Sequence, residues 1–324
     1  MCNTFRTFAL AAALALAGQS AALAADPWPT RTITVVVPVG AGSSSDLMTR
    51  IVMEQVSKQL GQPIVIENRP GGGGTVGAAS VVRAPADGYT LLSYGALAGA
   101  AALNPNLPYD TLADLTPVTA LGQQPLVMVV SANKDYKTAA DLVAAAKAKP
   151  GEMNYASAGN GSASHFGGAR FLVSTGLQAQ HIPYKGAADS MADVAAGRTD
   201  FSIQPIAVVL PLVRDGKLKA LATMAQARSS ALPDVPTARE AGLPADAVYP
   251  FYAGLFVSSK TPAEIVTKLH AEVDKALKDP GVKARLANIA ADPMPMSMSA
   301  FSAFFRDDVA SNIATVKAAN IRPQ

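Results

Sequence analysis

The sequence has 324 residues, of which 49% are hydrophobic and 16% are charged, and its formal net charge is +3 at pH 7. A chain of this length can bury a large core, and the length suggests two domains. Acidic and basic residues interleave without blocks, which argues against nucleic acid as a partner. The single cysteine, Cys2, leaves no second thiol for a disulfide and no ligand set for a zinc–cysteine site or an iron–sulfur cluster.

The N-terminus has the three parts of a secretory signal peptide. Arg6 precedes an apolar run, Phe8–Ala17, and the small-residue pattern Ala22-Leu23-Ala24 follows. The run is shorter than the ~20 residues that a membrane-spanning helix needs. We therefore expect residues 1–24 to be removed near Ala24 and the mature protein to be periplasmic. No cysteine stands at the cleavage point to carry a lipid anchor.

After this segment, short β-branched runs alternate with alanine-rich helical stretches, which is typical of an α/β protein with mainly parallel sheets. In chain order the predicted strand and helix pairs of the first part are Thr32–Val37 with Asp46–Leu60, Ile64–Glu67 with Thr75–Ala84, and the strand Thr90–Tyr94. The next are Leu126–Ser131 with Ala139–Lys147, Met153–Ser157 with Ala163–Thr175, Ala179–Pro183 with Ala187–Ala196, and Thr199–Ile203 with Ala207–Asp215. The last are the strands Ala220–Ala225 and Gly254–Val257 and the helix Ala263–Lys278.

Two stretches rich in proline, glycine and polar residues, Asn104–Thr119 and Ala227–Pro250, interrupt this alternation. We interpret them as lobe boundaries and predict that lobe one comprises residues 26–125 plus 226–324, while lobe two comprises residues 126–225. A chain that crosses twice between lobes forms a hinge, which favours a two-lobed protein that closes on a ligand.

The loops that follow the strands are the candidate binding elements, because ligands of open α/β sheets collect at the carboxyl ends of strands. Pro38–Asp46 combines glycines with serine hydroxyls at a helix start, and Ser157–His165 repeats this chemistry. Free amides at such helix starts favour an anion, although an ordinary turn with a serine cap is the alternative. A third loop, Pro183–Asp189, adds Lys185 and Asp189, whose alternative roles are a solvated charge and a partner of the helix dipole.

Three other kinds of site are less well supported. Gly72–Gly77 fits the dinucleotide pattern G-x-G-x-x-G, but no carboxylate follows at the spacing that the ribose contact needs. A secreted serine hydrolase is the main alternative function, using Ser162 or Ser164 with His165 or His181 and with Asp189, yet no G-x-S-x-G elbow surrounds these serines. The three histidines lack metal-ligand spacing. We therefore expect no cofactor and no metal.

Several motifs in one order resemble the Bug-type solute-binding proteins of tripartite tricarboxylate transporters, over essentially the whole mature chain. The motifs that carry the resemblance are Pro38–Asp46, Val65–Gly71, Asp87–Thr90, Tyr155–His165, Pro183–Gly186, Asp234–Thr237 and Glu240–Gly242. The resemblance implies a monomeric two-lobed periplasmic binding protein, not an enzyme, that takes a small carboxylate and serves the membrane permease subunits of such a transporter or a sensing pathway.

The resemblance also implies which residues hold the carboxylate, mostly through backbone amides, small hydroxyls and bridging water. Carried over position by position, they are Val39, Gly40, Ala41, Ser43, Ser44 and Asp46 in lobe one and Ser157, Asn160, Ser162, His165, Ala187 and Asp189 in lobe two. Val39 stands where the family commonly has a large aromatic residue, and Ser43-Ser44-Ser45 replaces a glycine-rich run that ends in threonine. A smaller side chain and added hydroxyls predict a ligand larger than a C4 dicarboxylate.

Overall fold

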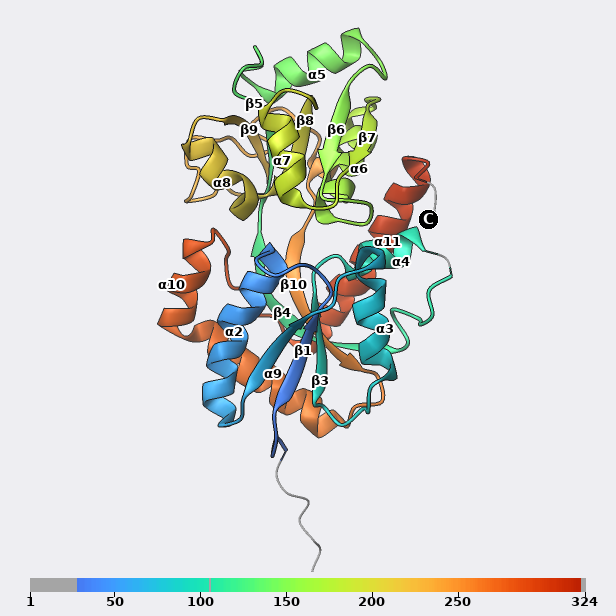
Figure 1. The fold of residues 1–324 in the computed structure, drawn as a ribbon, viewed down its shortest axis with the longest axis vertical. Helices are drawn as coiled ribbons and strands as arrows, with labels where there is room; N and C mark the ends of the chain where they lie inside the picture. The colour runs from blue at the N-terminus through green and yellow to red at the C-terminus, as the bar shows by residue number, and fades with distance from the viewer. Residues whose placement is uncertain (1–27, 105, 322–324) are drawn as a thin grey trace, which may run out of the picture. The chain divides into compact units, whose positions relative to one another are not determined.

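The computed structural model describes residues 28–104 and 106–321, so the predicted signal peptide, residues 1–24, lies outside the described residues. From Arg31 onward the chain forms one compact unit that contains two five-stranded sheets with flanking helices (Figure 1). The predicted α/β fold with two lobes is confirmed. Within the described ranges, no helix combines the length and the apolar character needed to cross a membrane.

The sheet of lobe one has the strand order β2-β1-β3-β10-β4. Its strands are β1 Ile33–Val37, β2 Ile64–Asn68, β3 Thr90–Tyr94, β4 Leu115–Gln124 and β10 Phe251–Ser258. β1 lies between β2 and β3 and is parallel to both, whereas β10 is antiparallel to both β3 and β4. Four strands therefore point one way, and the carboxyl ends of β1 and β3 meet at the same edge.

Helices of lobe one cover both faces of this sheet (Figure 1). They are α2 Ser44–Leu60, the short 3-10 turn η1 Gly72–Gly74, α3 Thr75–Arg83, α4 Leu97–Leu103, α9 Ala263–Lys278, α10 Pro280–Asn288 and α11 Met298–Ala318. On one face, α3, α4 and α11 pack against the strands, and Phe301 and Phe305 of α11 are fully buried beside Phe256 of β10. Their spacing of four residues places both rings on one side of the helix.

The sheet of lobe two repeats the plan with the strand order β7-β6-β8-β5-β9. Its strands are β5 Leu126–Ser131, β6 Asn154–Ser157, β7 Gln180–Pro183, β8 Phe201–Pro205 and β9 Leu218–Met224, and its helices are α5 Ala139–Ala148, α6 Ala163–Thr175, α7 Ala187–Ala195 and α8 Ile206–Arg214. β6 is parallel to β7 and β8, and β5 is antiparallel to β8 and β9. The opposed strand is thus fourth in both sheets.

These opposed strands begin where the chain passes from one sheet to the other. Only Pro125 separates β4 of the first sheet from β5 of the second, and residues 225–250, which include the 3-10 turn η2 Ala245–Ala247, lead from β9 back to β10. Helices α9, α10 and α11 then complete lobe one. The lobe limits given above, residues 126–225 for lobe two, stay a prediction.

The structure adds elements to those predicted. β4 was not predicted, because Pro117 and Gly122 mask its apolar pattern, and it begins inside the stretch interpreted as a lobe boundary. β4 is the edge strand next to β10, where proline is tolerated. α4, α10 and α11 were also not predicted. By contrast, the predicted limits of β3, β5, α6 and α9 are the observed ones.

Candidate functional site

The loop between β1 and α2 ends in a capped helix start. Ser43 is the N-cap, and its hydroxyl accepts a hydrogen bond from the Asp46 amide at 3.4 Å. Gly42 has a φ of 79°, a left-handed conformation that glycine adopts without strain. The first amides of α2 have no acceptor within the helix, so they are available to an anion.

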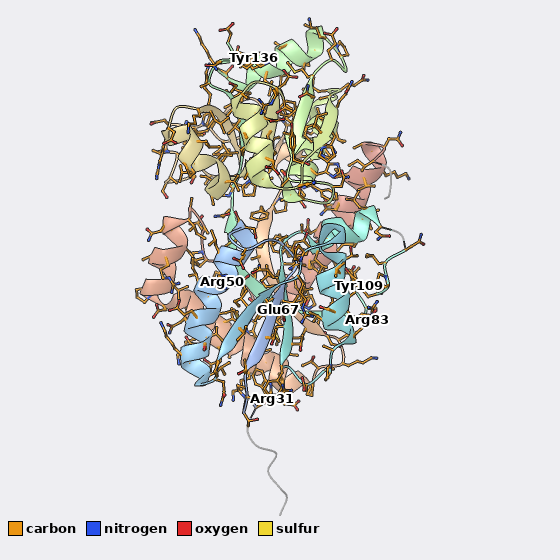
Figure 2. The ribbon with its side chains drawn as sticks, viewed as in Figure 1. Arg31, Arg50, Glu67, Arg83, Tyr109 and Tyr136 are labelled. Atoms are coloured by element: carbon orange, nitrogen blue, oxygen red, sulfur yellow. The ribbon has the colours of Figure 1, made fainter. Side chains whose placement is uncertain are left out.

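The Asp46 side chain stabilises this loop through hydrogen bonds on the side away from the cavity. Its carboxylate is buried and accepts hydrogen bonds from the Gly42 amide at 2.8 Å, from Asn68 Nδ2 at 2.9 Å and from Arg50 Nε at 3.0 and 3.1 Å. Asn68 Nδ2 also donates to the carbonyl of Val39 at 3.0 Å. Burial by itself would raise the pKa of Asp46, but the bonds from Arg50, Gly42 and Asn68 outweigh it and hold the pKa below its ordinary value. Figure 2 labels Arg50, on the outer side of α2.

A second capped helix start lies in lobe two, between β6 and α6. Ser162 is the N-cap of α6, and its hydroxyl accepts from the His165 amide at 3.2 Å and donates to the Gly159 carbonyl at 2.7 Å. Ser164 Oγ accepts from the Ala158 amide at 2.9 Å. Gly159 and Gly161 have φ values of 117° and 78°, so the loop turns sharply on glycines.

Two stacked histidines support the second loop from behind. His165 Nδ1 accepts a hydrogen bond from the Gly161 amide at 3.2 Å, and the His165 ring stacks on His181. His181 Nε2 lies 2.6 Å from Ser157 Oγ, and His181 stacks in turn on Tyr155. Burial lowers the pKa of His165 to about 3, with the neighbouring His181 adding to the shift, and burial lowers the pKa of His181 to about 4. Both rings are therefore neutral at pH 7.

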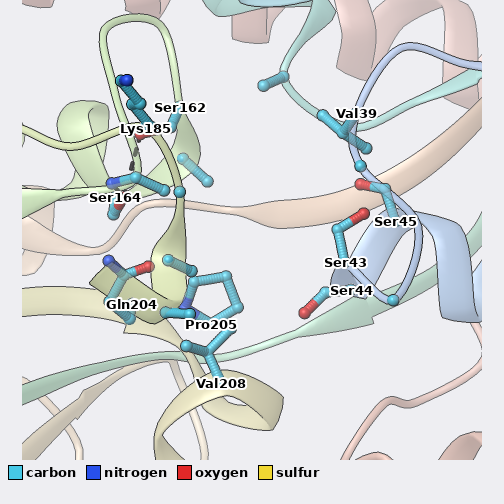
Figure 3. Close-up of a pocket in the computed structure, with 18 of the residues that line it drawn as sticks. Val39, Ser43, Ser44, Ser45, Ser162, Ser164, Lys185, Gln204, Pro205 and Val208 are labelled. Carbon is cyan, nitrogen blue, oxygen red and sulfur yellow. Dashed lines mark hydrogen bonds between the residues drawn. The ribbon is translucent and has the colours of Figure 1, made fainter. Parts of the chain in front are cut away.

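A cavity of about 1010 Å³ is lined by residues from both lobes. Figure 3 shows Val39, the N-cap Ser43 and Ser44 and Ser45 of α2 on one side of it, and Ser162, Ser164, Lys185, Gln204, Pro205 and Val208 on the other. Eight of the predicted ligand-binding residues line this cavity: Val39, Gly40, Ala41, Ser43, Ser44, Asn160, Ser162 and Ala187. The other four do not: Asp46, Ser157 and His165 are buried beneath the loops, and Asp189 is exposed on α7 outside the lining.

The electrostatics of the cavity favour an anion. The N-terminal turns of α2, α6 and α7 all contribute lining residues, and a helix N-terminus carries about half a positive charge. Lys185 and Lys217 add two ammonium groups, while the lining contains no aspartate or glutamate. Ser44 Oγ is buried at the start of α2 with no hydrogen-bond partner among the described residues. The hydroxyl and the amides around it are free to bind a carboxylate.

Several lining residues were not predicted from the sequence. Gln204 is buried at the end of β8, and its Nε2 donates to Ser190 Oγ at 3.0 Å. Phe251 and Tyr94 contribute aromatic surface. A signal for Gln204 was present, because an amide side chain inside an apolar strand needs a partner or a ligand.

The glycine-rich turn that resembles a dinucleotide motif forms part of the cavity wall. Gly71, Gly73 and Gly74 line it, and the Gly73 carbonyl accepts a hydrogen bond from Tyr94 Oη at 2.9 Å. A Cβ atom on Gly74 would lie 2.3 Å from the Tyr94 ring. Close packing against Tyr94 therefore explains the glycine without a nucleotide.

Among the described residues, Ser162 and Ser164, the serines of the hydrolase alternative, form no hydrogen bond with a histidine side chain. Their hydroxyls bond instead to the loop backbone and to each other, at 3.0 Å. Ser157 Oγ does contact His181, but Ser157 is fully buried beneath the loop. His165 Nδ1 is already occupied by the Gly161 amide. The described part of the chain also holds no group of three or more His, Cys, Asp or Glu side chains placed to bind a metal.

Comparison with solved structures finds close relatives of the whole fold. MatC of Rhodopseudomonas palustris, solved with bound malate, is 32% identical with a TM-score of 0.80, and the match covers 89% of this chain and 100% of that one. Rpa4515 of R. palustris, solved with adipate, is 30% identical with a TM-score of 0.84 and coverages of 92% and 100%.

Sequence comparison gives the same assignment. Protein BugT of Bordetella pertussis is 34% identical over 299 residues, which is 91% of this chain and 91% of BugT. The model of the tripartite tricarboxylate transporter family receptor (TctC) matches residues 48–321. The alternative of a serine hydrolase is therefore wrong, because this is a family of transporter receptors and not of enzymes. The chain belongs to the tripartite tricarboxylate transporter receptor family, whose members are periplasmic solute-binding proteins.

Proposed function

We propose that this protein binds a small carboxylate in the cavity of about 1010 Å³ and delivers it to the membrane permease subunits of a tripartite transporter. One observation carries the proposal: the N-termini of α2, from one lobe, and of α6 and α7, from the other, line the same cavity. Helix N-termini of opposite lobes that share an anion bind it better when the lobes close, so the carboxylate shifts the protein toward its closed state.

The proposed contacts are the amides and hydroxyls of Ser43, Ser44 and Ser162, with Asn160 and Ala187 beside them. Asp46, Ser157 and His165 hold the two loops in shape. Asp189, which lies outside the cavity lining, remains a predicted polar contact of the closed form. The binding of malate by MatC and of adipate by Rpa4515 supports a carboxylate ligand. Val39 in place of a large aromatic side chain supports a ligand larger than a C4 dicarboxylate.

A thermal-shift screen of the mature protein tests this function. A ligand that binds only the folded state stabilises it, by about 2.7 kcal/mol at a ligand concentration of 100 times Kd, and therefore raises the melting temperature. The panel contains mono-, di- and tricarboxylates, acidic amino acids and aromatic acids, with the matching amides as uncharged controls. Stabilisation by acids and not by their amides supports the proposal. Stabilisation by none of the acids, together with hydrolysis of chromogenic esters, would contradict it.

Two further parts of the proposal are tested separately. Export with removal of residues 1–24 predicts that the protein recovered from a periplasmic fraction begins at Ala25, and sedimentation analysis is expected to show a monomer. Delivery predicts that cellular uptake of the identified acid requires both this protein and the permease subunits. Uptake that is unchanged without this protein would instead favour a sensing role.

A further inference from the structure

One side of the cavity is apolar and is formed by two neighbouring helices of lobe two. Met191, Ala192 and Ala195 of α7 and Val208 and Leu212 of α8 line it, and we call these five residues the apolar wall. A spacing of four residues places Met191 with Ala195 on one face of α7 and Val208 with Leu212 on one face of α8, and Ala192 lies one turn before Ala195. Val208 lies opposite Ser43 and Ser44 across the cavity (Figure 3).

Val208 and Leu212 of the apolar wall pack against the core of lobe two and also line the cavity. Ile206, Val209 and Leu210 of α8 are buried and pack in the core of lobe two. Val208 and Leu212 are only partly buried, on the side that faces the cavity. A helix that is apolar on nearly all sides is normally covered on all sides. The part of Val208 and Leu212 that the core leaves uncovered faces the cavity.

The side chains of the wall differ in chemistry from the polar groups of the cavity. The serine hydroxyls and free amides gather at the starts of α2 and α6, while the wall itself contributes only hydrocarbon and thioether groups. Lys217 lines the cavity but forms an ion pair with Asp215 at 3.5 Å, so its charge is partly compensated. A short dicarboxylate, polar at both ends, would leave the wall in contact with water. A carboxylate with an alkyl or aryl body would satisfy both regions.

We propose that the ligand of this protein carries an apolar body, a straight alkyl chain or an aryl ring, which packs on the apolar wall while its carboxylate binds at the N-termini of α2 and α6. This inference rests on the proposed carboxylate-binding function. It assigns to α7 and α8 the choice among carboxylates, and to the serine loops the binding of the carboxylate that all of them share.

Calorimetric titration with a series of carboxylates of increasing chain length tests the wall. Butanoate, hexanoate and octanoate form one series, and succinate, adipate and suberate form the other, with benzoate as the aryl member. Burial of each added methylene is expected to lower Kd about fourfold, from the free energy of transferring a methylene out of water. The proposed role of the apolar wall would be overturned by a Kd that stays constant or rises with chain length in both series, with no gain in affinity for benzoate over acetate.

Variants of the wall separate this result from general damage. Leu212→Ala and Ala192→Asn are expected to weaken octanoate or suberate at least fivefold while changing acetate or succinate less than twofold. Ala192 is exposed, so its substitution does not require repacking of the lobe. Two substitutions outside the cavity lining serve as matched controls: Val213→Ala on α8, and Ala144→Asn at an exposed alanine of α5. Equal effects on short and long acids would contradict the proposal.

The outcomes distinguish failure of the proposed carboxylate binding from failure of the proposed role of the apolar wall. If no carboxylate of any length binds, the proposed function fails. If short acids bind and chain length gives no gain, the function stands and the apolar wall is wrong. If affinity rises with length in the wild type and the rise is lost in Leu212→Ala, the wall is supported.

Discussion

The imidazole of His165 lies flat against that of His181, with ring centroids 4.0 Å apart and ring planes within 4° of parallel. This pair stands directly beneath the loop that begins α6, because the Gly161 amide donates to His165 Nδ1. A protonated Nδ1 cannot accept that hydrogen bond. The hydrogen bond that fixes the loop at Gly161 therefore requires His165 to be neutral.

Stability is expected to fall as the solution is acidified below pH 6.5. The pKa of His165 is lowered to about 3 and that of His181 to about 4, whereas both groups take up a proton near pH 6.5 in the unfolded chain. The unfolded state then binds more protons between these values, and each histidine lowers the free energy of unfolding by up to about 1.4 kcal/mol per pH unit. Solvent access to His181 reduces its share.

Urea denaturation of the wild type and of His181→Phe at pH 7, 6 and 5 measures this dependence. Phenylalanine keeps a ring for stacking but cannot be protonated, so the variant should lose stability less steeply on acidification. Identical slopes for the two proteins would show that His181 does not contribute.

Asp308 has the opposite dependence. Tyr252 Oη donates to its Oδ2 at 2.9 Å and Asn312 Nδ2 to its Oδ1 at 2.8 Å, yet burial dominates and raises the pKa of Asp308 to about 6. The folded state holds this proton below about pH 6, while the unfolded state releases it near 3.8, so the associated stability is present at low pH and is lost as the pH rises through 6.

The variant Asp308→Asn removes this titration. Its stability relative to the wild type is expected to improve by up to about 1.4 kcal/mol per pH unit between pH 4 and pH 6, and to change little above pH 6. Asp307→Asn, the exposed neighbour on α11, is the control and should show no such trend. Chemical denaturation at both pH values gives the comparison, and a constant difference between Asp308→Asn and the wild type would exclude the effect.

Ser44 and Ser162 are expected to differ when each is replaced by alanine. Either change should weaken carboxylate binding by about 0.5–1.5 kcal/mol, the worth of one hydrogen bond. Ser162→Ala also removes the N-cap of α6 and should cost about 1 kcal/mol of stability, whereas Ser44 Oγ has no partner to lose and its replacement should not lower stability. Calorimetry and denaturation together separate the two effects; an unchanged Kd would exclude the serine concerned from the site.

Asp46→Asn is expected to reduce both stability and affinity although Asp46 does not touch the cavity. An amide cannot accept from the Gly42 amide, Asn68 and Arg50 at once, and each hydrogen bond to a charged group contributes about 1.5–3 kcal/mol. Glu67→Gln, an exposed carboxylate of β2, is the control. Affinity that is retained in Asp46→Asn would show that the serine loop keeps its shape without this bracing.

How far the sequence predicts the fold depends on the element. β5 and α9 were predicted with their observed limits, because an uninterrupted apolar run and a clear helical period are local signals. The antiparallel direction of β5 and β10 has no such signal, since it follows from where the chain crosses between the sheets. β4 was missed for the local reason already given, a proline and a glycine within it.

In the site, too, local features were predicted from the sequence and features that depend on the three-dimensional arrangement were not. Glycines and serines at strand ends predicted both loops that line the cavity, because their chemistry depends on residues that are adjacent in sequence. Met191, Val208 and Leu212 look like ordinary core positions of α7 and α8, and only their placement in space shows that they face the cavity. Asp46 was predicted as a ligand contact, and its bonds to Gly42 and Asn68 place it beneath the loop instead.

The donors at the starts of α2, α6 and α7 are largely backbone amides, and a point mutation replaces a side chain without deleting a peptide N–H. We therefore expect anion binding through these amides to survive most single substitutions. A single substitution in the apolar wall, by contrast, changes the shape of the cavity. After gene duplication, one copy can acquire affinity for a new acid through substitutions in the wall while its carboxylate-binding amides are kept. Libraries for an engineered biosensor should accordingly vary Ala192, Val208 and Leu212 and leave the serine loops intact.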